Sequence, residues 1–204
     1  MKARFITLEG IEGSGKTTSI ESINNFLEQK KVRYINTREP GASSIGSELR
    51  EILLNPNTNI SSDVELLLML ADRKDHVEKI ILPNLLNDIW VISDRFMDSS
   101  IAYQGGGRQL DLNMINSLST YLDLPNPDLT LLFDLPTRIS LERTKKRGEL
   151  DRFEKEDIEF HDRIRESYLK LANDNSNRIS VIDSSQSRDK VQAKVTGTIS
   201  KLFL

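Results

Sequence analysis

A chain of 204 residues is long enough to bury a large core, either as one domain or as two small ones. A net charge of −3 disfavours a nucleic-acid-binding protein, which normally carries a basic face. Without cysteine there are no disulfides or thiolate metal sites, two histidines disfavour a multi-histidine metal site, and the apolar runs are too short to span a bilayer. Because no apolar signal region precedes the first strand, we expect a soluble cytoplasmic protein that binds neither nucleic acid nor membrane.

The first half of the chain alternates short apolar runs with segments of helical periodicity. Ser62 and Glu65 have the spacing of a capping box at the start of a long helix, and Pro83 is expected to kink or restart that helix. We therefore expect a strand, a glycine-rich turn and a helix over residues 5–30, a strand over 32–37, a helix over 44–54 and a longer helix from 62 to about 87.

The second half continues the alternation. The glycine run after Gln104 indicates a mobile loop over 104–108, and Thr137 and Ser187 are expected to cap helices. The expected elements are strands over 89–93, 129–134 and 179–183, and helices over 96–103, 111–122, 137–146, 154–173 and 187–202.

Five apolar strands that alternate with helices predict an α/β fold with one doubly wound, five-stranded parallel sheet between layers of helices. No linker or repeat divides the chain, so we expect residues 1–204 to form one domain. Ligands of such sheets bind beyond the carboxyl ends of the strands. The site is therefore expected at that edge.

The segment Gly10-Ile11-Glu12-Gly13-Ser14-Gly15-Lys16-Thr17 fits the pattern G-x-x-x-x-G-K-[ST] and lies between a predicted strand and a predicted helix. Glycines allow the backbone amides and the helix N-terminus to surround a polyphosphate. Lys16 would reach the β- and γ-phosphates, and the Thr17 hydroxyl would bind Mg²⁺. An ordinary glycine-rich turn is the alternative, and the strand-turn-helix context disfavours it. The sequence predicts a P-loop nucleotide site.

A P-loop enzyme needs a second carboxylate near the metal at the end of a neighbouring strand. Asp94 and Asp134 both follow apolar runs. Arg95 follows Asp94 directly and could bind a second phosphate, so we expect Asp94 to bind Mg²⁺, directly or through water. The alternatives are a strand-end cap for Asp134 and a surface ion pair for Asp94 and Arg95.

A cationic segment follows the fourth strand, on the predicted ligand side. Such runs are usually solvated helix faces. Here a glycine interrupts the run, which favours a lid over residues 143–154 that closes an arginine onto the transferring phosphate. The cations are Arg143, Lys145, Lys146, Arg147 and Arg152.

The chain resembles the bacterial thymidylate kinases, which are P-loop nucleoside-monophosphate kinases. The resemblance spans nearly the whole length, and its motifs occur in order at family-like spacing. They are GIEGSGKT at Gly10, TREPG at Thr37, ADRxxH at Ala71, SDRF at Ser93, SSxAYQGGGR at Ser99 and RGELDRFE at Arg147.

The resemblance implies a role for each matching residue. Glu12 would face the sugar 3′-hydroxyl of the monophosphate and its phosphate, and Tyr103 would exclude a ribose 2′-hydroxyl. Arg73 and Gln104 would read the thymine edge. The implied dTMP site comprises Glu12, Arg38, Arg50, Met69, Arg73, Arg95, Ser99, Ser100, Tyr103 and Gln104; the ATP site comprises Gly10, Ile11, Glu12, Gly13, Ser14, Gly15, Lys16, Thr17, Thr18 and Arg143.

The resemblance also implies how the reaction is catalysed. The catalytic residues would be Glu12, Lys16 and Arg95 together with Arg147 and Arg152 of the lid, because Gly13 and Ser14 cannot supply a catalytic arginine from the P-loop. The resemblance further implies that Asp151 and Glu154 would bind metal or water in the lid.

Two positions depart from the family pattern. Met69 stands where a phenylalanine usually stacks on the base, which puts base selectivity in question, and Ala42 replaces a common second glycine. The implied activity is phosphorylation of dTMP to dTDP by ATP with Mg²⁺, in dTTP biosynthesis. A homodimer is implied as well, with the helix over 65–87 as one interface. The alternatives are a different nucleotide or deoxynucleoside kinase, or a P-loop switch or motor, for which no N-K-x-D signature is present.

Overall fold

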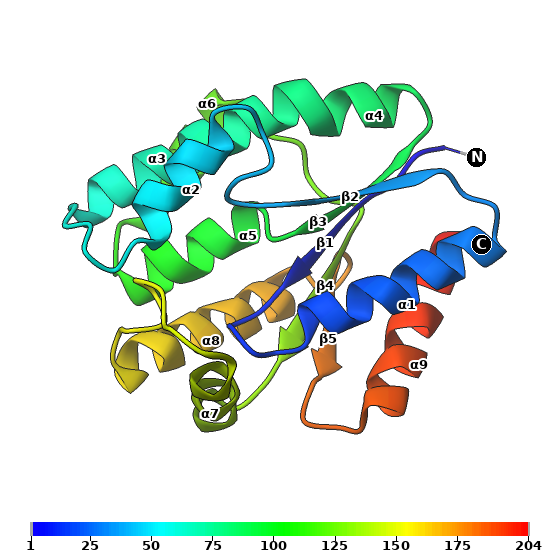
Figure 1. Ribbon diagram of the computed structural model, residues 1–204. Coiled ribbons are helices and arrows are strands. Elements are labelled where there is room, and N and C mark those ends of the chain that lie inside the picture. Colours follow the sequence, from blue (N-terminus) through cyan, green and yellow to red (C-terminus); the bar gives the residue numbers. More distant parts are fainter. Residues whose placement is uncertain (1, 204) are drawn as a thin grey trace.

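The computed structural model describes residues 2–203, without the side chain of Arg147. Five parallel strands form one sheet in the order β2-β3-β1-β4-β5 (Figure 1). They are β1 (Phe5–Glu9), β2 (Tyr34–Arg38), β3 (Trp90–Asp94), β4 (Leu129–Asp134) and β5 (Ile179–Asp183). The predicted parallel α/β sheet with helices on both faces is confirmed.

Side chains of β1 alternate between the two faces of the sheet, and all five are buried. Ile6 and Leu8 pack with the face covered by α1 (Lys16–Gln29) and α9 (Arg188–Ser200). Phe5 packs on the opposite face with apolar residues of α3 (Ser62–His76) and α6 (Leu112–Tyr121). Each fully buried side chain of this size contributes about 1.5–3 kcal/mol. Burial on both faces explains why the strands read as continuous apolar runs.

The second face is covered by helices that include α3, α6 and the later helix α8 (Ile158–Asp174) (Figure 1). The long predicted helix is α3 (Ser62–His76), which continues through a π-helical turn η1 (Val77–Ile81) into α4 (Leu82–Leu86). Pro83 lies in the first turn of α4, as the predicted restart requires. The expected capping box is wrong: Ser61 caps α3 by accepting the Val64 amide, and Glu65 is buried.

The expected mobile loop at 104–108 is also wrong. After the short α5 (Met97–Ser100), the chain forms a π-helical segment η2 (Ile101–Gly107) that packs against α8 (Ile158–Asp174). A Cβ at Gly106 would lie 2.6 Å from the Cβ of Ser167, and one at Gly107 would lie 2.6 Å from Phe160 Cε2. The glycines are used here for close packing and not for mobility.

The remaining helices differ from their predicted bounds at the ends. The helix expected at 154 is α8, which begins at Ile158 with Asp157 as its cap. Pro136, and not Thr137, is the N-cap residue of α7 (Thr137–Arg147). The helices α2 (Gly46–Leu54) and α6 (Leu112–Tyr121) and the 3₁₀ turn η3 (Lys201–Phe203) complete the elements. Within residues 2–203, no helix is long and apolar enough to cross a membrane.

Candidate active site

A cavity of about 480 Å³ lies beyond the carboxyl ends of β1, β2 and β3, where the fold predicts a ligand site. It extends from the N-terminus of α1 to α3 and η2. The ten residues implied for dTMP all line it, as do residues 12–18 of the P-loop and Asp94. Glu39, Pro40, Leu54, Asp151, Phe153 and Glu154 also line it.

The P-loop wraps around the N-terminus of α1. Gly15, the N-cap residue, has a φ of 92°, and Gly10 has a φ of 134°, both in the region that favours glycine. A Cβ at Gly10 would collide with the carbonyl oxygen of Phe133 on β4. The loop is thus held close to the sheet, and the first amides of α1 face the cavity. This geometry suits a polyphosphate.

Lys16 is buried, and its Nζ donates to the carbonyl oxygens of Gly10 and Ile11 at 3.0 and 3.2 Å. Gly10 and Ile11 therefore hold the lysine and are not among the lining residues. Burial and the positive charge of Arg95 lower the pKa of Lys16 to about 8, against the attraction of Asp94. A phosphate anion would favour the charged form, because it replaces neutral carbonyl partners with negative oxygens.

Arg95 and Glu12 form an ion pair at 2.6 Å between the P-loop and the end of β3. Tyr103 donates to both oxygens of Glu12 at 2.7 and 2.8 Å, and Arg95 NH2 donates to the Tyr103 hydroxyl oxygen at 3.0 Å. Burial raises the pKa of Glu12, but Arg95 and Lys16 outweigh it, so the net pKa is lowered. The alternative of a surface pair between Asp94 and Arg95 is wrong, because Arg95 pairs with Glu12 in the cavity.

Three arginines gather at the same end of the cavity. Arg50 NH1 donates to the carbonyl oxygen of Pro40 at 2.8 Å. Burial lowers the pKa of Arg50, and the charges of Arg38 and Arg95 lower it further, against Asp151 and Asp94. Guanidinium groups that repel one another in a cavity favour an anion between them.

Behind Arg95 lies a carboxylate that the sequence motifs do not identify. Glu9, the last residue of β1, is fully buried and accepts from the Phe96 amide at 2.8 Å, the Ser99 hydroxyl at 2.6 Å and the Tyr168 hydroxyl at 2.7 Å. Arg95 NH1 donates to the same two hydroxyl oxygens at 3.2 and 3.3 Å. Burial and the charge of Asp98 raise the pKa of Glu9 to about 7. Its place one residue before the P-loop is the signal that could have found it.

Asp94 and Thr17 fit the requirements of a Mg²⁺ site. Among the described residues, the buried Oδ1 of Asp94 has no hydrogen-bond partner. Thr17 lines the same cavity, and both side chains supply the oxygen ligands that Mg²⁺ prefers. Asp134, the other candidate, is paired with Arg165 at 2.7 and 3.0 Å, as expected for a structural residue.

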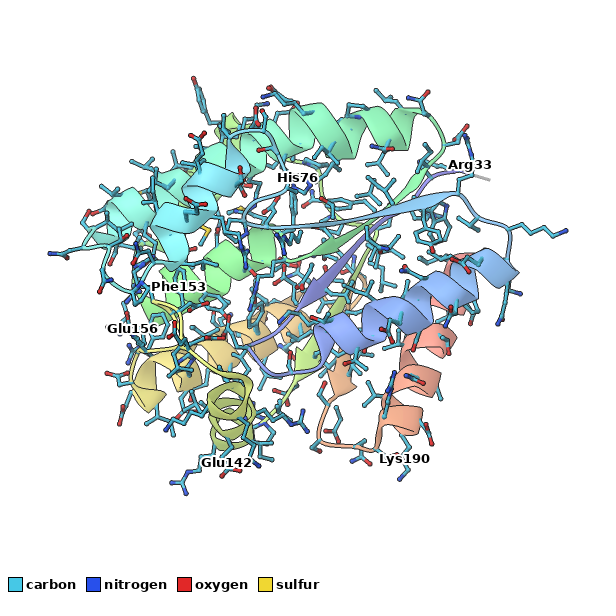
Figure 2. The ribbon with its side chains drawn as sticks, viewed as in Figure 1. Arg33, His76, Glu142, Phe153, Glu156 and Lys190 are labelled. Carbon is cyan, nitrogen blue, oxygen red and sulfur yellow. The ribbon has the colours of Figure 1, made fainter. Side chains whose placement is uncertain are left out.

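The far end of the cavity is polar and tightly bonded. Arg73 is 1% exposed and donates to Glu39 at 2.6 Å, to Ser100 at 2.7 Å and to the Phe96 carbonyl at 3.0 Å. Glu39 also bonds His76 at 2.8 Å. His76 is the last residue of α3, and its side chain points toward β2 (Figure 2). Neither Glu39 nor His76 was assigned from the sequence, although both belong to quoted motifs.

Gln104 and Met69 line this end as well. Gln104 is 1% exposed, and its Nε2 donates to Glu65 at 2.8 Å. Met69 is half-buried and packs with an apolar cluster of η2 and α8 that includes Tyr103. It therefore has both a packing contact and a face on the cavity.

Asp151, Phe153 and Glu154 of the segment over residues 143–154 line the cavity, whereas none of its described cationic side chains does. Arg152 does not line it: its NH1 donates to Glu65 at 2.7 Å and its Nε to the Leu53 carbonyl at 2.8 Å. Arg143 donates to the Gly13 carbonyl at 3.2 Å from an exposed position. The side chain of Arg147 lies outside the described residues. Figure 2 shows Phe153 and Glu156 on the segment between α7 and α8, and the Phe153 ring lines the cavity.

Comparison with known proteins agrees with this geometry. The family model for thymidylate kinase matches residues 8–195. The chain is 45% identical to the thymidylate kinase of Carboxydothermus hydrogenoformans over 99% of both chains, and 44% identical to that of Nitrosospira multiformis over the full length of both. The crystal structure of thymidylate kinase from Ehrlichia chaffeensis superposes with a TM-score of 0.79 at 32% identity, covering 98% of this chain and all of the other. This chain belongs to the thymidylate kinase family.

Proposed function

We propose that this protein phosphorylates dTMP to dTDP, with ATP as the phosphate donor. The observation that carries the proposal is the cluster of Arg38, Arg50 and Arg95 beside the P-loop, in one cavity. The P-loop binds the polyphosphate of one substrate, and the three arginines are suited to bind the phosphate of a second substrate. A nucleoside acceptor would bring no phosphate to these three guanidinium groups, so a nucleoside monophosphate fits better.

The residues of the cavity act by alignment and charge stabilisation. The P-loop amides and Lys16 hold the β- and γ-phosphates, and Arg95 holds the acceptor phosphate in line with them. Glu12 fixes Arg95 from the P-loop side and therefore ties the acceptor position to the donor position. The acceptor oxygen is already anionic, so no strong general base is needed. Exclusion of water by the lid completes the arrangement.

Thr17 and Asp94 would hold Mg²⁺ between them, Asp94 directly or through water. When bound there, the ion would neutralise negative charge that develops on the transferring phosphate. The unpartnered oxygen of Asp94 supports this assignment.

Base and sugar selection belong to the other end of the cavity. Arg73 and Gln104 would read the thymine edge, and Met69 would cover one face of the ring. Ser99 and Ser100 would line the same pocket and position Arg95 and Arg73, to which they are hydrogen-bonded. Tyr103, fixed by Glu12, would exclude a ribose 2′-hydroxyl by steric contact. One methyl group separates thymine from uracil and is worth only about 1–3 kcal/mol, so discrimination against dUMP is expected to be partial.

Residues 143–154 would form the lid within a single domain of residues 1–204, with Arg147 and Arg152 as its catalytic arginines and Arg143 at the ATP. Arg152 bonded to Glu65 corresponds to a resting position, because a guanidinium that reaches the γ-phosphate must first leave that carboxylate. Asp151 and Glu154 line the cavity from the lid and are suited to orient water there.

The test is a coupled assay of nucleoside diphosphate formation with dTMP, dUMP, UMP, dCMP and thymidine as acceptors. The expected result is the highest kcat/KM for dTMP, a smaller one for dUMP and little activity with UMP. A clear preference for dCMP, UMP or thymidine would overturn the substrate assignment. ATP hydrolysis that is independent of every acceptor would favour a switch or motor instead.

We further propose a cytoplasmic homodimer with α3 in its interface. Leu67 is 55% exposed and Val64 is 42% exposed on that helix, while Leu66 and Leu70 face the core. Sedimentation equilibrium of the wild type and of Leu67→Glu tests this: a dimer that the substitution dissociates is expected, and a monomeric wild type would refute it.

A further inference from the structure

Helix α3 places a buried carboxylate, that of Glu65, behind the base end of the cavity. Glu65 is 1% exposed and accepts hydrogen bonds from three residues. Its Oε1 accepts from Gln104 Nε2 at 2.8 Å, and its Oε2 accepts from Arg152 NH1 at 2.7 Å and from Arg108 Nε at 3.1 Å. Glu65 is not among the residues that line the cavity, so it touches no substrate there.

These partners hold the carboxylate in place. Arg108 is bound on its other side by Glu156 at 2.5 Å and lies over the Phe160 ring at 4.6 Å. Arg152 is anchored by the Leu53 carbonyl. Arg108 thus holds Glu65 from a fixed position, and Arg152 adds a second guanidinium in the resting position of the lid. The carboxylate cannot turn away from Gln104 without losing Arg108.

The partners of Glu65 also decide which end of the Gln104 amide faces the base. A carboxylate offers only acceptors, whereas a carboxamide has a donor end and an acceptor end. Because Arg108 pairs with Glu65 whether or not Arg152 has moved to the phosphates, Glu65 presents lone pairs to Gln104, and the amide nitrogen must turn toward it. The carbonyl oxygen is then the end that Gln104 offers to a base.

We propose that Glu65 determines the base specificity of the acceptor site by fixing the orientation of the Gln104 amide. An amide carbonyl accepts a hydrogen from N3 of thymine or uracil, whereas N3 of cytosine is itself an acceptor and is rejected. Glu65 is a positioning residue, since it acts only through Gln104. This inference rests on the proposed function, because it takes the base of the acceptor to lie beside Gln104.

The test is Glu65→Gln, which keeps the size of the side chain and supplies both a donor and an acceptor end. Gln104 can then present either end to the base. The ratio of kcat/KM for dTMP over dCMP is expected to fall about 10-fold or more, since a reversed amide exchanges a hydrogen bond for an unpaired group. The ratio for dTMP over dUMP is expected to stay unchanged, because both bases carry hydrogen on N3.

The matched control is Glu156→Gln, which makes the same change in the other carboxylate bound to Arg108 and has no contact with Gln104 among those described. Its dTMP over dCMP ratio is expected to equal that of the wild type. An unchanged ratio in Glu65→Gln would overturn the proposal. An equal fall in both variants would also overturn it, because the cause would then be loosening around Arg108.

A second measurement uses the wild-type protein and needs neither activity nor a folded Glu65 variant. The side-chain amide hydrogens of Gln104, assigned by NMR from their loss in Gln104→Leu, are expected to exchange with solvent much more slowly than those of the exposed Gln29. Exchange as fast as that of Gln29 would overturn the orientation. A wild type that does not phosphorylate dTMP but shows slow exchange would refute the proposed function and leave the orientation intact.

Discussion

Replacing Glu9 with glutamine should reveal how Arg95 is oriented. As a carboxylate, Glu9 takes the protons of Ser99 and Tyr168, so the lone pairs of both hydroxyls face Arg95 NH1. A glutamine amide cannot serve all three donors. If the glutamine nitrogen faces the hydroxyls, their protons turn to Arg95. If it faces Phe96, it meets the Phe96 N–H, whose nitrogen lies 2.8 Å from the present acceptor oxygen.

Either arrangement leaves a buried donor unsatisfied, which costs about 1–3 kcal/mol. If Arg95 bears that cost while it binds the acceptor phosphate, kcat/KM for dTMP falls by roughly 10- to 100-fold. The effect depends on pH, because a protonated Glu9 also carries one donor. Burial and Asp98 raise the pKa of Glu9 to about 7, with Arg95 opposing, so the wild type approaches the variant as the pH falls below 7.

The assay is kcat/KM for dTMP between pH 5.5 and 8.5, expressed at each pH as the ratio of Glu9→Gln to wild type. The ratio cancels the titration of the substrate phosphate, whose second pKa lies near 6. We expect the smallest ratio at pH 8 and a rise toward one as the pH falls. A ratio that does not change with pH would refute the role of the ionised carboxylate. Glu28→Gln, which makes the same change in an exposed carboxylate that accepts from the Tyr34 hydroxyl, is the matched control, and its ratio to wild type is expected to stay near one at every pH.

The same pKa predicts the direction of a stability change. The folded protein holds the Glu9 proton more tightly than the unfolded chain, whose glutamate has the ordinary pKa of 4.5. This contribution is therefore complete below pH 4.5 and is lost as the pH rises through about 7, up to about 3 kcal/mol. Glu9→Gln lacks it. In urea unfolding, the stability of the variant relative to wild type should increase with pH, and a decrease would contradict the raised pKa.

Four other substitutions test the lid, the metal site and the P-loop. Arg147→Ala and Arg152→Ala are expected to lower turnover far more than ATP affinity, toward the roughly 10³-fold that such arginines supply, and unchanged turnover in both variants and in the double variant would refute the lid assignment. Asp94→Asn should raise the Mg²⁺ concentration for half-maximal activity by about 10- to 100-fold, measured by titrating activity with Mg²⁺. An unaltered midpoint would refute the assignment of Asp94 to the Mg²⁺ site. Gly10→Ala should cost roughly 1–3 kcal/mol or more in urea unfolding because of its positive φ and the Phe133 carbonyl, and wild-type stability would contradict the close approach.

The parts of the site that follow from the sequence are those encoded within one continuous segment. The P-loop needs only consecutive glycines, a strand and a helix, so its geometry is readable from residues 10–17. Glu12, Arg38 and Arg95 of the implied acceptor site lie at or just after strand ends, and a parallel sheet brings strand ends together. That is why a one-dimensional pattern placed them in one cavity.

The parts that could not be predicted depend on contacts across the chain. Glu9 and Tyr168 are 159 positions apart, and nothing in the local pattern of either marks the pairing. The sequence alone predicts that Glu65 belongs to a helix cap, because Ser62 precedes it at the spacing of a capping box. Its hydrogen bonds to Gln104 and Arg152, 39 and 87 positions away, are what fixes it instead.

The packing of η2 against α8 limits how the base end of the cavity can change over generations. Any single substitution of Gly105, Gly106 or Gly107 adds at least a Cβ, and each would press on Leu112, Ser167 or Phe160. Variants that alter base preference or escape an inhibitor at this end are therefore expected to arise on α3 or at residues 99–104. Heritable change in the three glycines would need a paired change in the side chain that faces each of them.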